Sequence, residues 1–266
     1  MDRQSAIDFC LKHGTPLERH RARFLFEGYR DDDEAIGLIE SIECPGGGFS
    51  YKRVPGNPAC LSDTTVHLGV MIELGLADST VAHRTARFLF SNQLEDGGWD
   101  ENPALLDYDP PPWDKPGEIA TRTWLTGEII RTLARIVDPR HEKLAEGCRF
   151  LLSSYDGEKI AGYRIAGALA LAAFSLTGSV EKAVLDSLLS TVAGYLAEET
   201  DPAFLSWHLD CLRDHGLEAD DASIARSLTR LESLQNENGS WGTEDGPEWT
   251  VNTTINALRH LMGVGW

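Results

Sequence analysis

The sequence lacks any apolar stretch long enough to cross a membrane, and it has few basic residues for its length. No window approaches the roughly 18 uninterrupted apolar residues of a membrane helix, and the N-terminus has none of the segments of a secretory signal. Its 24 basic residues stand against 42 acidic ones, for a formal net charge of -18, which repels nucleic acid and anionic membrane surfaces. We therefore expect a cytoplasmic protein with no nucleic acid partner and no integral membrane segment.

Cysteine is scarce, and several well-known catalytic motifs are missing. The five cysteines are odd in number and contain no Cys-x-x-Cys pair, which predicts reduced thiols rather than a disulfide framework or a structural zinc site. The sequence also has no glycine-rich phosphate loop, no Gly-x-Ser-x-Gly elbow and no His-Glu-x-x-His helix. These absences argue against nucleotide-dependent chemistry and hydrolase triads.

Three turns, in contrast, share one spacing of glycine and aromatic residues. Residues 93–99 and 235–241 both read Gln, three residues, Gly, one residue, Trp, and residues 43–49 keep the Gly and an aromatic with Glu replacing Gln. Phe49 and Trp99 are about 50 residues apart, and Trp99 and Trp241 about 142, close to three units of roughly 47. This spacing predicts a repeat protein with two weaker units between the last two turns.

Each unit is predicted to hold two helices. Amphipathic first helices at 80–93 and 222–235 end at the turns, because Gly adopts the positive-φ conformation of a helix C-cap. More apolar second helices follow Ser-, Thr- or Asp-rich starts, which we expect to cap them. These are predicted at 66–74, 124–136, 165–176 and 255–262. The acidic run 31–34 is interpreted as the cap of a further outer helix at 34–43.

The remaining apolar patterns complete the predicted architecture. The weaker units are predicted at 142–155 with 160–176 and at 180–196 with 204–212, and two N-terminal helices at 4–12 and 16–29. About six helix pairs result, which is enough to close an all-α (α/α)6 toroid, a barrel of inner and outer helices, in one domain over residues 1–266. A ligand cavity in such a fold is expected at the centre, between the inner helices.

The turns carry a specific family resemblance. The Gln-x-x-x-Gly-x-Trp spacing, between an apolar helix and a Thr-rich inner helix, resembles the QW repeat of squalene-hopene cyclases and other class II terpene cyclases. Gly47-Gly48-Phe49 is similar to the turns of protein prenyltransferase β subunits. Three turns match, within a pattern that covers most of the chain. The resemblance implies that Gln93, Trp99, Gln235 and Trp241 are structural residues.

The resemblance also directs the search for a catalytic acid. A class II cyclase needs a carboxylic acid that stays protonated in an apolar site, and the family carries it in an Asp-x-Asp-Asp motif at an inner-helix start. Here the four residues before Thr64 read Cys-Leu-Ser-Asp, so Asp63 alone matches. The other two starts have Arg122 and Asn252 at that place. Asp63 is therefore the first candidate acid, in a chain that departs from the rest of the motif.

Further candidate acids lie near the insertion at 106–114, Leu-Asp-Tyr-Asp-Pro-Pro-Pro-Trp-Asp. It is longer than the linkers after Phe49 and Trp241, and its three prolines are expected to hold it extended. Asp107 and Asp109 are candidates as an acid or as ligands that hold Mg²⁺ against a diphosphate; the alternative is a solvated surface loop. Glu118 is a candidate acid too, although a Glu there also favours a helix N-terminus electrostatically.

Aromatic residues on or beside the second helices are the candidate substrate-binding groups: Trp124, Tyr163, Phe204, Trp207 and Trp249. Aromatic faces stabilise carbocations by about 0.5–2 kcal/mol each and bury prenyl chains; ordinary core packing is the alternative. His67 and Asn252 are two further candidate substrate-binding residues. A zinc site from the pairs Asp63 with His67 and His208 with Cys211 is conceivable by spacing, but zinc is not expected. We expect no cofactor, and Mg²⁺ only with a diphosphate substrate.

Taken together, the sequence favours an enzyme over a binding module. The first hypothesis is a terpene-cyclase-like enzyme that acts on a polyprenyl or polyene substrate in an aromatic-lined central cavity by carboxylic-acid protonation. The alternative is a non-catalytic or partner-dependent isoprenoid- or peptide-binding module resembling a prenyltransferase β subunit, with a protein partner or a second copy of the chain. A carbohydrate-active toroid with Asp63, Glu118 or Asp201 as its carboxylates is a third hypothesis, which the turns argue against.

Overall fold

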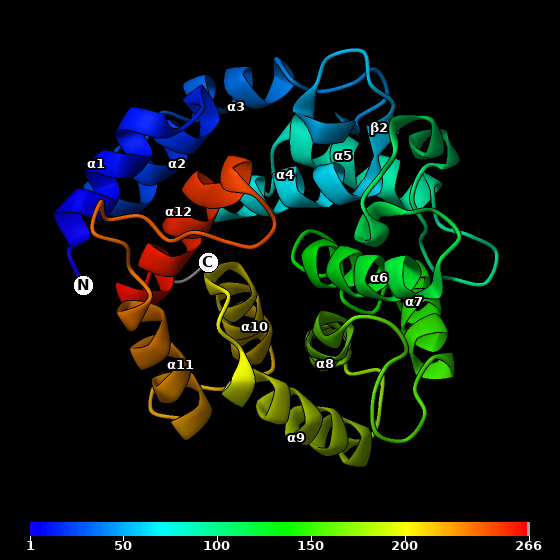
Figure 1. Cartoon of the computed structure of the whole chain (residues 1–266). Coiled ribbons are helices and arrows are strands. Elements are labelled where there is room, and N and C mark those ends of the chain that lie inside the picture. The colour runs from blue at the N-terminus through cyan, green and yellow to red at the C-terminus, as the bar shows by residue number, and fades with distance from the viewer. Residues whose placement is uncertain (265–266) are drawn as a thin grey trace. The chain divides into compact units, whose positions relative to one another are not determined.

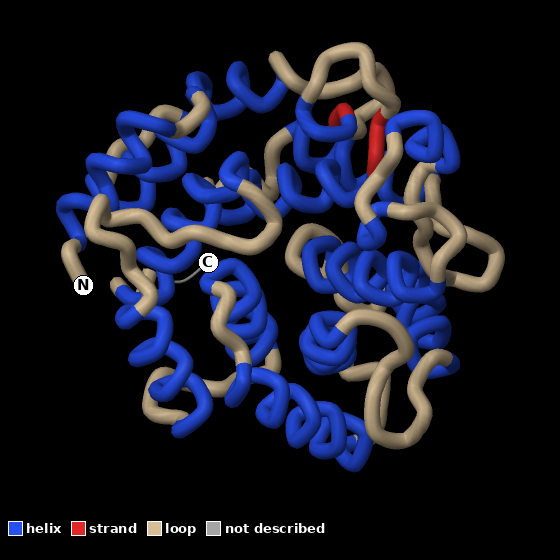
Figure 2. Tube along the Cα trace, in the orientation of Figure 1, coloured by secondary structure: helices blue, strands red, loops and turns tan. Residues whose placement is uncertain are grey.

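Helices make up most of the chain in the computed structural model, which describes residues 1–264 (Figures 1 and 2). Two short antiparallel strands, β1 (Phe49–Ser50) and β2 (Ala59–Cys60), pair Phe49 with Cys60. The helices are α1 (Arg3–His13), α2 (Pro16–Glu27), α3 (Asp32–Glu40), α4 (Leu61–Glu73), α5 (Thr80–Ser91), α6 (Ile119–Leu133), α7 (Glu142–Ser153), α8 (Arg164–Thr177), α9 (Lys182–Glu198), α10 (Pro202–Asp214), α11 (Ala222–Ser233) and α12 (Thr250–Leu261). Short 3-10 helices are η1 (Tyr51–Arg53), η2 (Pro103–Tyr108), η3 (Pro112–Asp114) and η4 (Pro247–Trp249). Every helix predicted from the sequence is therefore confirmed, with boundaries shifted by a few residues.

The helices divide between two compact units. The terminal unit combines residues 1–38 with the described residues from 193 onward, and the middle unit spans residues 39–192. In the terminal unit α12 packs against α1, α2 and α10, and in the middle unit α6 packs against α4, α7 and α8. In each unit, the helix that contacts these other helices is the second helix of a predicted pair. The closed single domain stays a prediction.

First and second helices differ in how much of their surface is buried. The first helix α5 buries one stripe, with Val81, Ala82, Thr85, Ala86 and Leu89. The second helix α8, in contrast, is buried continuously from Ile165 to Phe174, as expected of a helix that is apolar all round. None of the helices among the described residues is long and apolar enough to cross a membrane. The burial pattern confirms the predicted contrast between charged first helices and apolar second helices.

The three turns share one hydrogen bond to the next helix. The backbone N–H of each turn aromatic donates to a threonine hydroxyl: Phe49 to Thr64 over 3.0 Å, Trp99 to Thr126 over 2.9 Å, and Trp241 to Thr254 over 3.0 Å. Both tryptophans are fully buried. Their indole N–H groups donate to Leu89 and Leu231, each over 2.7 Å and each ten residues back in the preceding helix. Each turn therefore joins the helix before it to the helix after it.

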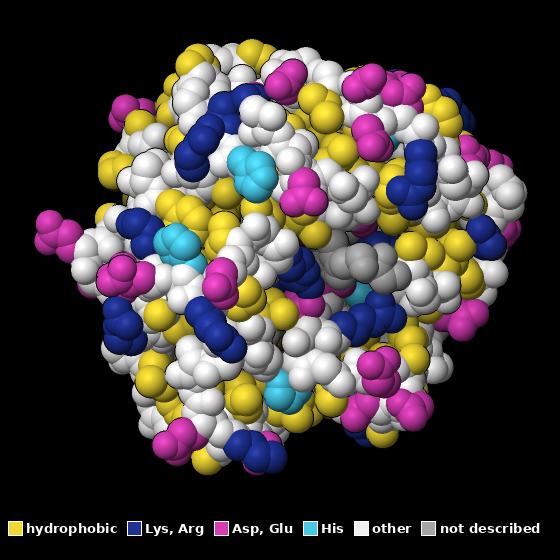
Figure 3. Space-filling model, turned by 180° about the vertical axis from the view of Figure 1, so that it is seen from behind, with side chains coloured by type: hydrophobic (Ala, Val, Ile, Leu, Met, Phe, Trp, Pro, Cys, Tyr) yellow, Lys and Arg dark blue, Asp and Glu magenta, His cyan; other side chains and the backbone are white. Residues whose placement is uncertain are grey.

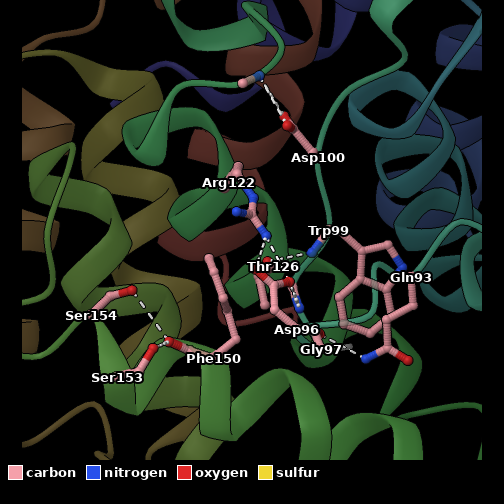
Figure 4. A network of polar contacts seen from close by, with 12 residues as sticks. Gln93, Asp96, Gly97, Trp99, Asp100, Arg122, Thr126, Phe150, Ser153 and Ser154 are labelled. Carbon is pink, nitrogen blue, oxygen red and sulfur yellow. Dashed lines mark hydrogen bonds and ion pairs between the residues drawn. The ribbon is translucent and has the colours of Figure 1, made fainter.

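The Gln side chain fastens its turn to the following first helix. The amide of Gln93 donates to the carbonyl of Gly97 over 2.7 Å (Figure 4). It also donates to the carbonyl of Lys143, in α7, over 2.7 Å. Gln235 repeats this with Gly239 over 3.0 Å and with Asp2, the N-cap of α1, over 2.8 Å. In the first turn Glu43 pairs with Arg84 of α5 instead. The Gln positions are thus used for structure in both units.

Close packing explains the glycine that the turns have in common. Gly47, Gly97 and Gly239 have φ values of 100°, 88° and 86°, which favour glycine. A Cβ atom would meet backbone atoms of the next first helix in each case, at 2.8 Å from Arg84, 2.5 Å from Glu146 and 2.4 Å from Ser5. The turn therefore requires glycine for its conformation and for its contact with a neighbouring helix.

The predicted caps of the second helices are wrong in one respect. Cys60, Glu118 and Trp249 are the N-cap residues of α4, α6 and α12, and none of them caps its helix with a side-chain hydrogen bond. The threonines lie inside the helices, where the hydroxyls of Thr123 and Thr254 donate to carbonyls four residues back.

The predicted helix cap in the acidic run 31–34 is confirmed, since α3 begins at Asp32 and the Asp31 carboxylate accepts the Glu34 N–H over 2.9 Å.

We predict that Gly97→Ala lowers the free energy of unfolding by about 3 kcal/mol, because the left-handed backbone costs an alanine about 1–2 kcal/mol and the clash with Glu146 adds about 1–3 kcal/mol. The control is Gly117→Ala, since Gly117 has a φ of 86° but no atom within 4 Å of an added Cβ. It should cost only about 1 kcal/mol. Urea unfolding measures both, and equal losses would refute the role of the close contact.

Candidate functional site

A buried carboxylate holds the start of α4 in the middle unit. Glu101, two residues after the turn aromatic Trp99, is 2% exposed. Its two oxygens accept the backbone N–H groups of Leu61 over 2.9 Å and Ser62 over 2.6 Å. These are unpaired donors at the helix N-terminus. Glu101 thus caps α4 from a distant segment of the chain, in place of the local cap that α4 lacks.

Asp63, the acid candidate from the family resemblance, is also buried at this helix start. Its carboxylate accepts the Lys52 N–H over 2.8 Å and the Cys60 thiol over 3.3 Å, and Arg53 Nε lies 4.0 Å away. Burial raises the pKa of Asp63, while the thiol, Arg53 and the Lys52 N–H lower it. The effect of burial outweighs these groups, so the pKa of Asp63 lies above its ordinary value.

The backbone beside Asp63 has an uncommon conformation. Lys52 and Arg53 both have positive φ values, 55° and 57°, where residues other than glycine are rarely found. Such backbone costs free energy and tends to occur at functional sites. Here it turns the Lys52 N–H toward the Asp63 carboxylate.

The insertion after Trp99 contributes a third buried carboxyl group, Asp114. The expected extended conformation is wrong: the insertion folds into η2 and η3, and Asp114 ends η3. Three hydrogen bonds hold the insertion in place. Two of them come from α6: Trp124 Nε1 donates to the Trp113 carbonyl over 2.8 Å, and Thr121 donates to the Pro112 carbonyl over 3.3 Å. In the third, Gly117 N donates to Asp100 over 2.9 Å. Asp114 is consequently held at 9% exposure.

Asp114 has the most perturbed acidity of the three carboxyl groups. Burial raises its pKa to about 7, with further increases from the charges of Glu101 and Asp63; the Ser62 hydroxyl and Lys52 act in the opposite direction. Burial and neighbouring like charge both favour the neutral form of a carboxyl group. Near neutral pH a large fraction of Asp114 therefore carries a proton that it can donate.

Aromatic residues lie on elements next to the three buried carboxyl groups Asp63, Glu101 and Asp114, which we define as the acidic cluster. Tyr51 is 2% exposed, and its ring meets that of Tyr108 edge-on with 6.4 Å between centroids. Trp124, predicted to bind substrate, is 8% exposed and anchors η3 through its indole N–H. Burial raises the pKa of Tyr163, with smaller contributions from Glu118 and Asp114. These residues do not identify a substrate.

The other predicted acids of this region have different surroundings. Asp107, Asp109 and Glu118 are exposed, and Glu118 pairs with Lys115 over 3.6 Å. The predicted binding residue His67 is buried, stacks on Phe49 at 4.3 Å, and contacts the Asp63 carbonyl oxygen through Nδ1 over 2.7 Å. These residues stay predictions, with burial favouring Asp114 over the three exposed carboxylates.

The remaining predicted residues belong to the terminal unit. Asn252 accepts a hydrogen bond from Arg21 over 2.7 Å, Phe204 and Trp207 lie on α10 with 6.3 Å between ring centroids, and Trp249 directly precedes α12. Asp201 caps α10 and also accepts hydrogen bonds from Thr243 and Glu244. The substrate-binding role of the first four stays a prediction, whereas Asp201 is engaged in structural contacts.

The sequence analysis did not anticipate a buried ionic network in the terminal unit. Arg259, 1% exposed, binds both oxygens of Asp210, at 2.8 and 2.7 Å. His260 Nε2 lies 3.3 Å from Asp210, and Arg213 lies 2.9 Å from His260 Nδ1. Burial lowers the pKa of His260. The network joins α10 to α12, and these ion pairs between two helices are sufficient for a structural role.

No group of three His, Cys, Asp or Glu side chains within residues 1–264 is arranged to hold a metal ion. A hollow of about 340 Å³ in the middle unit is lined by Cys148, Leu152, Thr177 and Ser179, among others, and by none of the acidic cluster. On the face drawn in Figure 3, acidic and basic side chains are interspersed. The acidic cluster is therefore the arrangement with the clearest chemical capacity, namely proton donation from a buried site.

Comparisons with solved structures identify the fold. Neither a protein-family model nor a curated protein matches the sequence. A protein from Actinoplanes is similar in structure at 16% identity, over 97% of this chain and 87% of its own, with a TM-score of 0.60. A variant of MstE, a type II terpene cyclase from Scytonema, in complex with merosterolic acid A as product, is similar at 16% identity over 98% of this chain and 85% of its own, with a TM-score of 0.56.

A second structure of MstE, a variant in complex with geranylgeranyl dihydroxybenzoate as substrate, gives the same result. It is similar at 15% identity over 97% of this chain and 86% of its own, with a TM-score of 0.57. At this identity the likeness shows the fold alone. It confirms the predicted fold class, an all-α fold of the terpene cyclase type.

The acidic cluster predicts how stability depends on pH. Asp114 has a folded pKa of about 7 against an ordinary value of 3.8. Its contribution to the free energy of unfolding is therefore complete below pH 3.8 and is lost as the pH rises through about 7. We expect Asp114→Asn to remove this loss, worth about 2–4 kcal/mol, so that the variant is more stable than the wild type at about pH 8.

Urea unfolding at about pH 5 and about pH 8 measures this difference. Asp107→Asn is the matched control, because Asp107 belongs to the same insertion and is exposed. Its pH dependence should equal that of the wild type. Equal pH dependence in the wild type and Asp114→Asn would contradict the raised pKa.

Proposed function

We propose that this protein is a terpene-cyclase-like enzyme in which Asp114 starts the cyclisation of a polyprenyl or polyene substrate by protonating it. The observation that carries this proposal is the grouping of three buried carboxyl groups at the start of α4, where two have backbone N–H donors and the third has the surroundings of a neutral acid. A proton donor of this kind is what alkene protonation requires.

The three carboxyl groups have different roles in this proposal. Glu101 acts as a charged group that caps α4: burial raises its pKa, whereas the N–H groups of Leu61 and Ser62, whose hydrogen bonds it accepts, act in the opposite direction. Asp63 accepts the Lys52 N–H and lies near Arg53, and it acts as a second negative neighbour of Asp114. Their charges raise the pKa of Asp114. The acid that the sequence alone assigned to Asp63 is thereby moved to Asp114, with Asp63 in support.

The proposed first step moves one proton. The π electrons of a substrate double bond form a new C–H bond with the Asp114 proton, and the electrons of the broken O–H bond remain on the carboxylate. The resulting carbocation is then attacked by the next double bond of the chain. Rings on neighbouring elements, from Tyr51, Trp124 and Tyr163, stabilise positive charge through their π faces, and burial strengthens these interactions.

The substrate class rests on the fold and on the demands of this step. The similar structure of MstE was determined with geranylgeranyl dihydroxybenzoate as substrate, which supports a polyprenyl chain for the present protein. Protonation of an alkene needs no cofactor, and Mg²⁺ would enter only through a diphosphate on the substrate. Cyclisation that ends by loss of a proton conserves the substrate's composition.

A binding module is the second candidate, and one observation favours it. Of the Asp-x-Asp-Asp motif expected from the family resemblance, only Asp63 is present. In that case the protein would bind an isoprenoid or a peptide, alone or with a partner, and would perform no proton transfer. The two proposals predict different results in a product assay.

The test is incubation with geranylgeranyl diphosphate, farnesyl diphosphate and squalene, followed by product analysis of the wild type and Asp114→Asn. We expect a cyclised product whose formation falls about 10²–10⁴-fold in the variant, the usual range for a lost general acid. Glu95→Gln is the matched control, because Glu95 is an exposed acid of the 93–99 turn. It should retain the wild-type rate.

Two outcomes would overturn the assignment. A product formed at an unchanged rate by Asp114→Asn would remove Asp114 from the chemistry, and a loss in Asp63→Asn alone would return the role to Asp63. Binding of all three compounds without turnover would favour the module.

A further inference from the structure

The buried ionic network of the terminal unit contains a histidine whose protonation state follows from its contacts. His260, on α12, is 1% exposed. Its Nδ1 lies 2.9 Å from Nη1 of Arg213, on α10, and its Nε2 lies 3.3 Å from Oδ1 of Asp210, also on α10. The two ring nitrogens therefore face groups of opposite charge on one neighbouring helix.

The contact with Arg213 determines which ring nitrogen carries the hydrogen. A guanidinium group has donors only and stays charged in proteins. Nδ1 of His260 is then the acceptor, and the single hydrogen of the neutral ring is on Nε2, facing Asp210. A ring with hydrogen on both nitrogens would set an N–H group against an N–H group of Arg213. The geometry thus requires a neutral His260.

The other charged groups of the network agree with a neutral ring. Arg259 binds both oxygens of Asp210, at 2.8 and 2.7 Å, so the carboxylate already has a cationic partner. Burial lowers the pKa of His260 from the ordinary value of 6.5; Arg259 and Arg213 act in the same direction, and Asp210 opposes them. Glu218, which follows α10, favours the charge of Arg213.

The other elements that pack on α12 bring no charged contact to His260 among the residues that the structure describes. On α2 the buried Arg21 also reaches α12, but it donates to Asn256 and Asn252, one and two turns before His260. On α1 the buried titratable side chain is Cys10, and α11 buries none. The 3-10 helix η4 adjoins the opposite end of α12. Arg213, Asp210 and Arg259 are therefore the charged neighbours of the ring.

We propose that His260 is an acid-sensitive lock between α10 and α12. The neutral ring accepts a hydrogen bond from Arg213 and so joins the two helices. A proton added to Nδ1 removes this acceptor and places a second positive charge beside that of Arg213. The junction then loses a contact and gains repulsion in a buried place, so it opens. This inference is independent of the proposed function.

The lock connects helices that carry predicted substrate-binding residues. Phe204 and Trp207 lie on α10, and Asn252 lies on α12. Opening of the junction changes how these residues are placed relative to one another. Acid would thus act on the predicted binding residues of the terminal unit as well as on its stability.

The direction of the pH effect follows from linkage. The opened chain takes up a proton on His260 near the ordinary value of 6.5, whereas the closed junction resists it. The contribution of His260 is therefore complete above about pH 6.5 and is lost as the pH falls. Each further pH unit should raise the opening constant about tenfold, until the closed form itself takes up the proton. Asp114 acts in the opposite direction, because its contribution is lost as the pH rises.

The first test determines the hydrogen positions in the wild-type protein. Nitrogen NMR of protein with isotope-labelled histidine distinguishes the two neutral forms of the ring, and above pH 6.5 we expect His260 to have its hydrogen on Nε2. His208 is an internal control, because its Nδ1 lies 2.8 Å from the carbonyl oxygen of Phe204 and should carry the hydrogen. A charged His260, or one with its hydrogen on Nδ1, would overturn the inference.

The second test measures the opening of the junction by hydrogen–deuterium exchange of the amides of α10 and α12, corrected for the intrinsic effect of pH. Between neutral pH and one unit below 6.5 the opening constant of the wild type should rise about tenfold. His260→Asn should lose this rise, because its amide oxygen keeps an acceptor for Arg213 and takes up no proton in this range.

The matched control is His83→Asn, since His83 is an exposed histidine on α5 of the middle unit. Its opening constant should depend on pH as in the wild type. The lock is refuted if the wild type shows no rise, or if His260→Asn shows a rise of the same size. Should His260→Asn fail to fold, the NMR result on the wild type decides by itself.

Discussion

The buried carboxylate of Glu101 is the contact on which the acid site depends. By accepting the N–H groups of Leu61 and Ser62 it fixes where α4 begins, and with it the place of Asp63 in the first turn. The same charge lies close enough to Asp114 to raise its pKa. One side chain thus satisfies the free donors of a helix end and disfavours ionisation of a neighbouring acid, two effects that come from a single buried negative charge.

The helices were predictable because their signals are local. Apolar spacing marks the faces that must be buried, and a glycine with positive φ ends each first helix. The threonines show where local reasoning stops. Thr64 and Thr254 have the residue type of a cap, yet they lie inside α4 and α12 and accept the N–H of a turn aromatic. That use depends on a contact between segments, which residue preference at a helix start does not reveal.

The acid site was predictable in part. Asp63 followed from the family resemblance, whereas Asp114 lies in an insertion where Asp107 and Asp109 have the same chemistry, and only the contacts that fold η3 onto α6 bury it. Glu101 had a usable signal. It stands two residues after Trp99, as Thr243 stands two residues after Trp241, and each contacts the start of an earlier helix, α4 or α10. The position two residues after the turn tryptophan is thus in contact with a helix start in both of these turns.

The central claim is that a buried carboxylic acid begins the reaction by giving its proton to a carbon atom of the substrate. The most direct measurement is mass spectrometry of the product formed in deuterium oxide, from whichever of the three polyprenyl compounds is converted. Exchange with solvent places deuterium on the acid beforehand, so the account predicts a cyclised product of the substrate's composition with one deuterium bound to carbon. A product that lacks solvent deuterium, or one formed by loss of diphosphate, would contradict it.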